Sequence, residues 1–92
     1  MTRLSDEEIE RALGTGEWRR EGDAIERELT LESFAAAMAF ANRVGEAAEA
    51  ADHHPDILVH GWNRVRLHLT THSAGGLTQR DLDLSRAIDQ LV

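Results

Sequence analysis

The chain has 92 residues, no cysteine, and seventeen acidic against ten basic side chains, which gives a formal net charge of −7. A chain of this length is expected to form one small domain over residues 1–92, which buries only about 60–65% of the surface of the unfolded chain. The absence of cysteine excludes disulfides, thiolate metal ligands and a cysteine nucleophile. The negative charge disfavours direct binding of nucleic acid, because the protein repels phosphate backbones. The first residues lack an apolar segment, and no stretch approaches about 20 apolar residues, so we expect a soluble, cytoplasmic protein without membrane association.

The first third of the chain predicts a helix followed by a hairpin. Ser5 and Glu8 have the spacing of a capping box, which starts a short helix. Residues 17–20 and 24–29 flank a turn sequence at 21–23 that contains a glycine, and apolar and charged residues alternate in the second segment. These segments are therefore predicted to be two antiparallel strands.

A long second helix is predicted next, with Thr30 as its cap and its end at about Ala51. Apolar residues recur there at helical spacing, at Phe34, Met38 (or Ala37), Ala41, Val44 and Ala48. Nine alanines make this helix smooth over more than one face, which exceeds what packing on one sheet requires. We therefore expect a helical interface between copies of the chain.

A second hairpin and a last helix complete the predicted fold. Residues 57–59 and 62–71 form its strands around a turn at His60-Gly61, and the longer strand alternates apolar and charged residues, so that one face is buried. Thr78 and Asp81 have capping spacing at the start of the last helix. The prediction is an α+β domain in the order α-β-β-α-β-β-α, with a four-stranded antiparallel sheet covered by helices on one face.

Three of the five histidines fall at two places where elements end. Asp52-His53-His54-Pro55 follows the long helix, and Thr71-His72-Ser73 ends the last strand. Pro55 stops the helix and favours an extended conformation for His54. Taken alone, a His-His-Pro segment after a helix is more often a solvent-facing loop than a functional site.

A metal site is a second interpretation, because imidazole is a common ligand for zinc. No ligand spacing such as His-Glu-x-x-His is present, and His60 and His68 belong to a turn and to a polar strand face. We therefore expect no metal, and we expect these two histidines to be ordinary surface residues.

The two histidine segments belong to a longer pattern of spaced residues. It consists of Glu49, three residues, His53-His54-Pro55, Trp62 seven positions after Pro55, Thr71-His72, three residues, Gly76-Leu77-Thr78, Asp81 and Leu84. This combined motif resembles the pterin-4a-carbinolamine dehydratases over about residues 18–89. A tyrosine is common in that family where this chain has Trp62, and the first sixteen residues carry little of the pattern.

The resemblance implies a dehydratase that eliminates water from a 4a-hydroxytetrahydropterin and gives quinonoid dihydropterin, in the recycling of a cofactor used by aromatic amino acid hydroxylases. Such a reaction needs an acid and a base that titrate near neutrality, which suits histidine, and it requires no metal or organic cofactor. By resemblance His53, His54 and His72 are catalytic, and Asp81 orients an imidazole. We favour His53 and His72 as the proton-transfer pair, with His54 binding the substrate. Asp81 alone would be an ordinary acidic residue at a helix start.

The resemblance also implies the pocket and the partners. The partners are a small-molecule pterin, further copies of the chain in a homodimer or homotetramer, and a functional link to an aromatic amino acid hydroxylase. The alternative is a non-catalytic module, since members of this family serve as dimerisation partners of a homeodomain transcription factor and related folds act as assembly chaperones. The three histidines and Asp81 favour the enzyme, because a scaffold would not need them. The residues expected to line the pterin pocket are Pro55, Thr71, Ser73, Ala74, Glu49, Asp52 and Trp18, the last of which could equally pack on the sheet.

Overall fold

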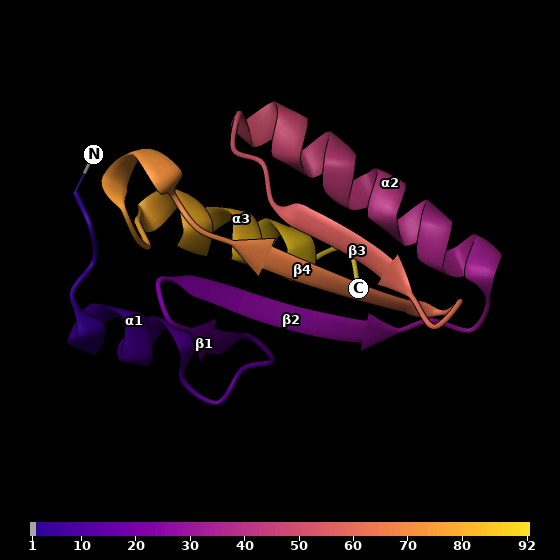
Figure 1. Ribbon diagram of the computed structural model, residues 1–92, viewed down its shortest axis with the longest axis horizontal. Coiled ribbons are helices and arrows are strands. Elements are labelled where there is room, and N and C mark those ends of the chain that lie inside the picture. The colour runs from indigo at the N-terminus through magenta and orange to yellow at the C-terminus, as the bar shows by residue number, and fades with distance from the viewer. Residues whose placement is uncertain (1) are drawn as a thin grey trace.

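The computed structural model describes residues 2–92 and confirms the predicted α+β fold and its order of elements (Figure 1). One short 3-10 turn, η1, is added before the last helix. The elements are α1 (Asp6–Leu13), β1 (Arg19–Glu21), β2 (Ala24–Thr30), α2 (Phe34–Ala51), β3 (Asp56–His60), β4 (Arg64–Leu69), η1 (His72–Ala74) and α3 (Gln79–Asp89).

The four strands form one antiparallel sheet in the order β1-β2-β4-β3. The two hairpins therefore meet through their longer strands, where Leu29 of β2 lies opposite Val65 of β4. On its other side β4 pairs with β3, and Ile57 lies opposite Leu67. Strand β4 is thus interior, and its carboxyl end reaches η1 and the start of α3.

The core lies between the sheet and the helices. Val65, Leu67 and Leu69 alternate along β4 and are fully buried, whereas the residues between them face the other side of the sheet. Helix α2 runs beside β3, and α1 lies near β1 at the opposite edge (Figure 1). The buried apolar residues of the helices and strands form one cluster, which includes Ile9 of α1, Phe40 and Val44 of α2, and Leu84 and Ile88 of α3.

The start of the long helix differs from the prediction. Thr30 does not cap α2, because it is still paired with Arg64 as the last residue of β2. The hydroxyl of Ser33 instead accepts a hydrogen bond of 3.0 Å from the backbone amide of Ala36. Both residues could cap a helix, and the pairing between β2 and β4 decides between them.

The turn of the second hairpin is also displaced from its predicted position. Strand β3 extends through His60, and the turn consists of residues 61–63. Gly61 and Trp62 have φ angles of 54° and 59°, a left-handed pair typical of tight hairpin turns. A Cβ atom on Gly61 would lie 2.5 Å from the Arg64 guanidinium, so glycine is needed there both for its conformation and for space.

The predicted caps of the two shorter helices are present. At α1, Ser5 and Glu8 form the reciprocal capping box, and the hydrogen bonds from Ser5 lower the pKa of the Glu8 carboxyl. At α3, the carboxylate of Asp81 accepts a hydrogen bond of 2.9 Å from the backbone amide of Thr78. Among residues 2–92, no helix is both long and apolar enough to cross a bilayer.

The other face of the sheet carries charged pairs that cross between strands. His60 Nε2 lies 2.6 Å from Glu28 Oε1, and Arg66 donates to the same oxygen at 3.1 Å. His68 Nδ1 lies 2.7 Å from Glu26 Oε2. His60 and His68 are thus both paired with carboxylates of β2.

The pair of His60 and Glu28 gives a prediction about pH. The hydrogen bond from His60 is the largest cause that lowers the pKa of Glu28. Replacing His60 by alanine should therefore raise the pKa of this carboxyl toward its ordinary value, as measured by NMR titration of the side chain. Because the folded-state pKa is lowered, the interaction stabilises the fold above the unfolded-state pKa, and this contribution is lost as pH falls through the folded-state value.

A His68→Ala variant serves as the control, since His68 pairs with Glu26 and not with Glu28. This variant should leave the pKa of the Glu28 carboxyl unchanged. An unchanged titration of Glu28 in His60→Ala would contradict the assigned cause.

Candidate active site

His53 and Asp81 form a buried pair at the end of the core. Helix α2 stops at Asp52, which has a left-handed φ of 50°, and the backbone amide of His53 then bonds to the carbonyl oxygen of Ala48. This turn directs the imidazole inward, where His53 is 8% exposed and Asp81 is 0% exposed. Nε2 of His53 lies 2.6 Å from Oδ1 of Asp81. The pair therefore joins the end of α2 to the first turn of α3.

The second carboxylate oxygen of Asp81 is also fully engaged. Oδ2 accepts a hydrogen bond of 2.7 Å from the hydroxyl of Thr71 and one of 2.9 Å from the amide of Thr78. The hydroxyls of Thr71 and Thr78 lie 2.9 Å apart, and both residues are buried. Asp81 also occupies the first turn of α3, where the helix dipole favours a negative charge. A buried carboxylate is stable in this position because every donor around it is directed at it.

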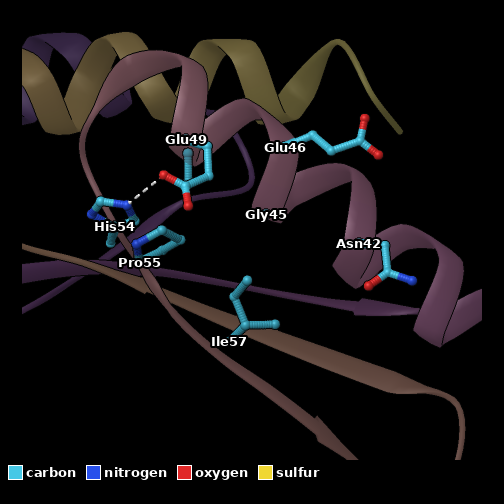
Figure 2. A pocket seen from close by; sticks show the side chains of 8 residues that line it. Asn42, Gly45, Glu46, Glu49, His54, Pro55 and Ile57 are labelled. Atoms are coloured by element: carbon cyan, nitrogen blue, oxygen red, sulfur yellow. Dashed lines mark hydrogen bonds and ion pairs between the residues drawn. The ribbon is translucent and has the colours of Figure 1, made fainter.

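His54, the next residue, points out of the core into a groove between α2 and the start of β3 (Figure 2). Its Nε2 lies 3.3 Å from Oε2 of Glu49, and both side chains are largely exposed. An exposed pair of this kind contributes only about 0–1 kcal/mol, so His54 can turn toward a ligand at little cost.

The groove has a volume of about 750 Å³, within the range of about 300–1,000 Å³ typical of small-molecule sites. In Figure 2 the side chains of His54 and Glu49 face each other near Pro55, while Asn42 and Glu46 lie farther along α2. Polar side chains lie at both ends of the groove, and apolar surface lies between them. The lining residues are Asn42, Gly45, Glu46, Ala48, Glu49, His54, Pro55 and Ile57.

His72 lines a second, smaller cavity of about 290 Å³ on another part of the surface. It is exposed and begins η1, where Thr71 pairs with Gly76 and Gly75 has a φ of 70°. Because Thr71 is bonded to Asp81, the backbone that carries His72 is held next to the buried pair. The residues around this cavity are Glu21, Asp23, Ala24, His68, Thr70, His72, Gly75 and Gly76.

The predicted site residues thus fall into three neighbouring groups. His53, Asp81 and Thr71 form the buried cluster; His54, Glu49 and Pro55 lie at the groove; and His72 lies at the smaller cavity. Five predicted pocket residues line neither cavity. They are Thr71 in the buried cluster, Ser73 and Ala74 in η1, Asp52 at the end of α2, and Trp18, which is buried in the core and whose indole N–H donates to Oδ1 of Asp89 at 2.8 Å.

The histidines do not gather around one point that could bind a metal. Within residues 2–92, no group of three or more histidine, aspartate or glutamate side chains is arranged to hold a metal ion. His60 and His68 pair with glutamates of β2 instead.

Sequence reasoning missed several residues of the site. Thr78 was predicted as a helix cap and as part of the family motif, but its hydroxyl contact with Thr71 was not predicted. Asn42 and Glu46 line the groove together with Glu49, and their helical spacing of three and four residues could have placed them on one face of α2. Ile57 was assigned only to a strand.

The chain is similar in sequence to proteins of one known family. A family model described as pterin 4 alpha carbinolamine dehydratase matches residues 2–91. A protein of Nocardia farcinica is 56% identical over 89 residues, covering 96% of this chain and 93% of its own length, and one of Roseiflexus is 54% identical over 93 residues, covering 99% and 98%. Both are provisionally named pterin-4-alpha-carbinolamine dehydratase.

Two solved structures are similar to the fold. A crystal structure described as a transcriptional coactivator/pterin dehydratase from Brucella melitensis has a TM-score of 0.91 and 31% identity, and covers 98% of each chain. A pterin dehydratase-like protein, identified as a RuBisCO assembly factor in the alpha-carboxysome, has a TM-score of 0.67 and 22% identity, over 80% of this chain and 87% of its own. The second similarity shows the shared fold alone.

Proposed function

The chain belongs to the pterin-4-alpha-carbinolamine dehydratase family, and from this premise we propose that it eliminates water from a 4a-hydroxytetrahydropterin to give quinonoid dihydropterin. The observation that carries this proposal is the buried pair of His53 and Asp81, with Nε2 and Oδ1 2.6 Å apart. A scaffold does not need an imidazole held against a buried carboxylate, whereas proton transfer does. The absence of cysteine fits a reducing cytoplasm, which is where we place the reaction.

The proposed reaction breaks one carbon–oxygen bond and moves two protons. An acid gives a proton to the 4a hydroxyl, which leaves as water. A base takes a proton from a ring nitrogen, and the electron pair of that N–H bond forms the new carbon–nitrogen double bond. No electrons leave the substrate, so the protein needs only groups that exchange protons near neutral pH.

We assign His53 and His72 to the two proton transfers, and His54 to binding of the pterin. His53 is fixed by Asp81, and His72 is attached to the same cluster through Thr71. His54 and Glu49 offer nitrogen and oxygen atoms at the mouth of the groove, against the apolar ring of Pro55. Each well-placed acid or base contributes about 10²–10⁴ in rate.

The remaining predicted residues support the site through the elements that carry it and make no contact with the pterin in this proposal. Ser73 and Ala74 shape the loop that carries His72. Asp52 turns the chain so that His53 enters the core, and Trp18 fixes the end of α3 through Asp89. An aromatic amino acid hydroxylase would supply the carbinolamine.

The direct test is dehydration of 4a-hydroxytetrahydropterin, followed by stopped-flow absorbance at several pH values around neutrality. We expect the wild type to accelerate the reaction, and His53→Ala and His72→Ala each to lose at least about tenfold, because each variant lacks one proton-transfer group. His54→Ala should mainly raise KM.

The matched control is His60→Ala, which removes a histidine that pairs with Glu28 and lines neither cavity. It should keep nearly all of the activity. No acceleration by the wild type over buffer would refute the enzyme and favour the non-catalytic scaffold.

We also propose that the protein forms a homodimer or homotetramer through α2. Phe34 and Met38, one helical turn apart, are 55% and 42% exposed, and Ile57 of the neighbouring β3 is 37% exposed. Large apolar side chains that gather on one face are typical of an interface. The same face would serve the alternative function, a dimerisation or assembly scaffold.

The oligomer is tested by light scattering at micromolar concentration. The wild type should have the mass of two or four chains, and the double variant Phe34→Glu with Met38→Glu should have a lower mass, because charges would be buried at the interface. Val92→Glu, which alters an exposed apolar residue at the end of the chain, is the control. A wild type of one-chain mass would contradict the proposal.

A further inference from the structure

When Asp81 is ionised, the hydrogen bonds around it have one consistent set of directions. An ionised carboxylate accepts and never donates, so His53 Nε2 and the hydroxyl of Thr71 must both donate to it. A threonine hydroxyl has a single proton, and that of Thr71 is committed to Asp81. In the contact of 2.9 Å between the two hydroxyls, Thr78 is therefore the donor. A directed chain runs from Thr78 through Thr71 to Asp81.

The same directions determine which nitrogen of His53 can react. In the neutral imidazole only one ring nitrogen carries a proton, and here it is Nε2, which donates to Asp81. Nδ1 then holds the free electron pair. It forms no hydrogen bond within residues 2–92, and no buried side-chain nitrogen or oxygen there lacks a partner, so Nδ1 reaches the surface. His53 is thereby presented as a base through Nδ1.

We propose that Thr78 is a positioning residue, whose hydroxyl fixes Thr71 and Asp81 and so holds His53 in the orientation that leaves Nδ1 free to act as a base. The inference rests on the proposed dehydratase function and adds a residue that makes no contact with the pterin. It also changes the role of Thr71, which was expected to line the pterin pocket. The hydroxyl proton of Thr71 is committed to Asp81, and its side chain is buried, so it acts with Thr78 and does not bind the substrate.

The geometry explains why the hydroxyl of Thr78 matters for orientation. Without it, the hydroxyl oxygen of Thr71 loses the donor that fixes its position, and the Thr71 side chain is held by its bond to Asp81. A change in the χ1 rotamer of Thr71 would then leave Oδ2 with the backbone amide of Thr78, and the carboxylate would be free to tilt. Because Oδ1 contacts His53 at 2.6 Å, a tilt of the carboxylate misaligns the imidazole. Small misplacements of a catalytic group reduce the rate strongly and leave substrate binding nearly unchanged.

The experiment compares Thr78→Ala, Thr78→Ser and Thr71→Val with wild type in the dehydration assay. Thr78→Ala and Thr71→Val should each lower kcat by about tenfold with little change in KM, because Thr71→Val loses a hydrogen bond to a charged group and Thr78→Ala loses the bond that fixes its donor. Thr78→Ser keeps the hydroxyl and should recover most of kcat.

The control for the substitution is Thr30→Val, which makes the same change as Thr71→Val at an exposed strand residue. Circular dichroism at the assay temperature verifies that each variant is folded, and Thr71→Val remains informative if Thr78→Ala loses the cap of α3.

A second readout does not depend on activity. Proton NMR should show the Nε2–H proton of His53 protected from exchange with solvent in the wild type and in Thr78→Ser, and exchanging at least about tenfold faster in Thr78→Ala and Thr71→Val. Equal protection in all variants, or loss of kcat in Thr78→Ser equal to that in Thr78→Ala, would overturn the role of Thr78 while leaving dehydration intact. A wild type without dehydratase activity would instead refute the proposed function, whatever the exchange rates.

Discussion

The buried carboxylate of Asp81 is the constraint on which the site depends. It holds three parts of the chain together, because His53 follows α2, Thr71 follows β4 and Thr78 caps α3. Removing a charge from water carries a large free-energy cost, which only a full set of well-aligned donors offsets. Any shift of α2, β4 or α3 relative to the others would leave part of this charge without a partner. The same contacts that fix the packing of the helices on the sheet therefore also fix the orientation of the imidazole.

This constraint separates two adjacent histidines into different environments. His53 is buried and held by a carboxylate, while His54 is exposed and only loosely paired with Glu49. The difference fits the two tasks that we propose for them, proton transfer by a fixed imidazole and binding by an exposed one. His72 lies after the end of β4, on the loop anchored by Thr71. A few buried hydrogen bonds thus join elements distant in the sequence at Asp81, while His54 and His72 remain at separate cavities on the surface.

Most of the fold could be predicted from the sequence because its determinants are local. The capping spacings of Ser5 with Glu8 and of Thr78 with Asp81, and the alternation along β4, specify helix starts and a strand face without any knowledge of the partners. The start of α2 could not be predicted, since Thr30 and Ser33 are both good caps and the choice depends on pairing with β4. Local patterns could not predict the contact of His53 with Asp81, 28 residues apart, and the family resemblance implied only that Asp81 orients one of the imidazoles. Local patterns also did not indicate that His54 and His72 line separate cavities. That outcome depends on the directions of the two side chains, which are determined by the turn after α2 and by the start of η1.

The central claim is that Asp81 holds His53 in one tautomer with Nδ1 as its free nitrogen. Nitrogen-15 NMR of the histidine rings measures this directly, because protonated and unprotonated ring nitrogens resonate at widely separated shifts. At a pH where His53 is neutral, the account predicts a protonated Nε2 and an unprotonated Nδ1, with no averaging between the two forms. A protonated Nδ1, or averaged shifts as in free histidine, would contradict it and would remove the physical basis for the proposed proton transfer at His53.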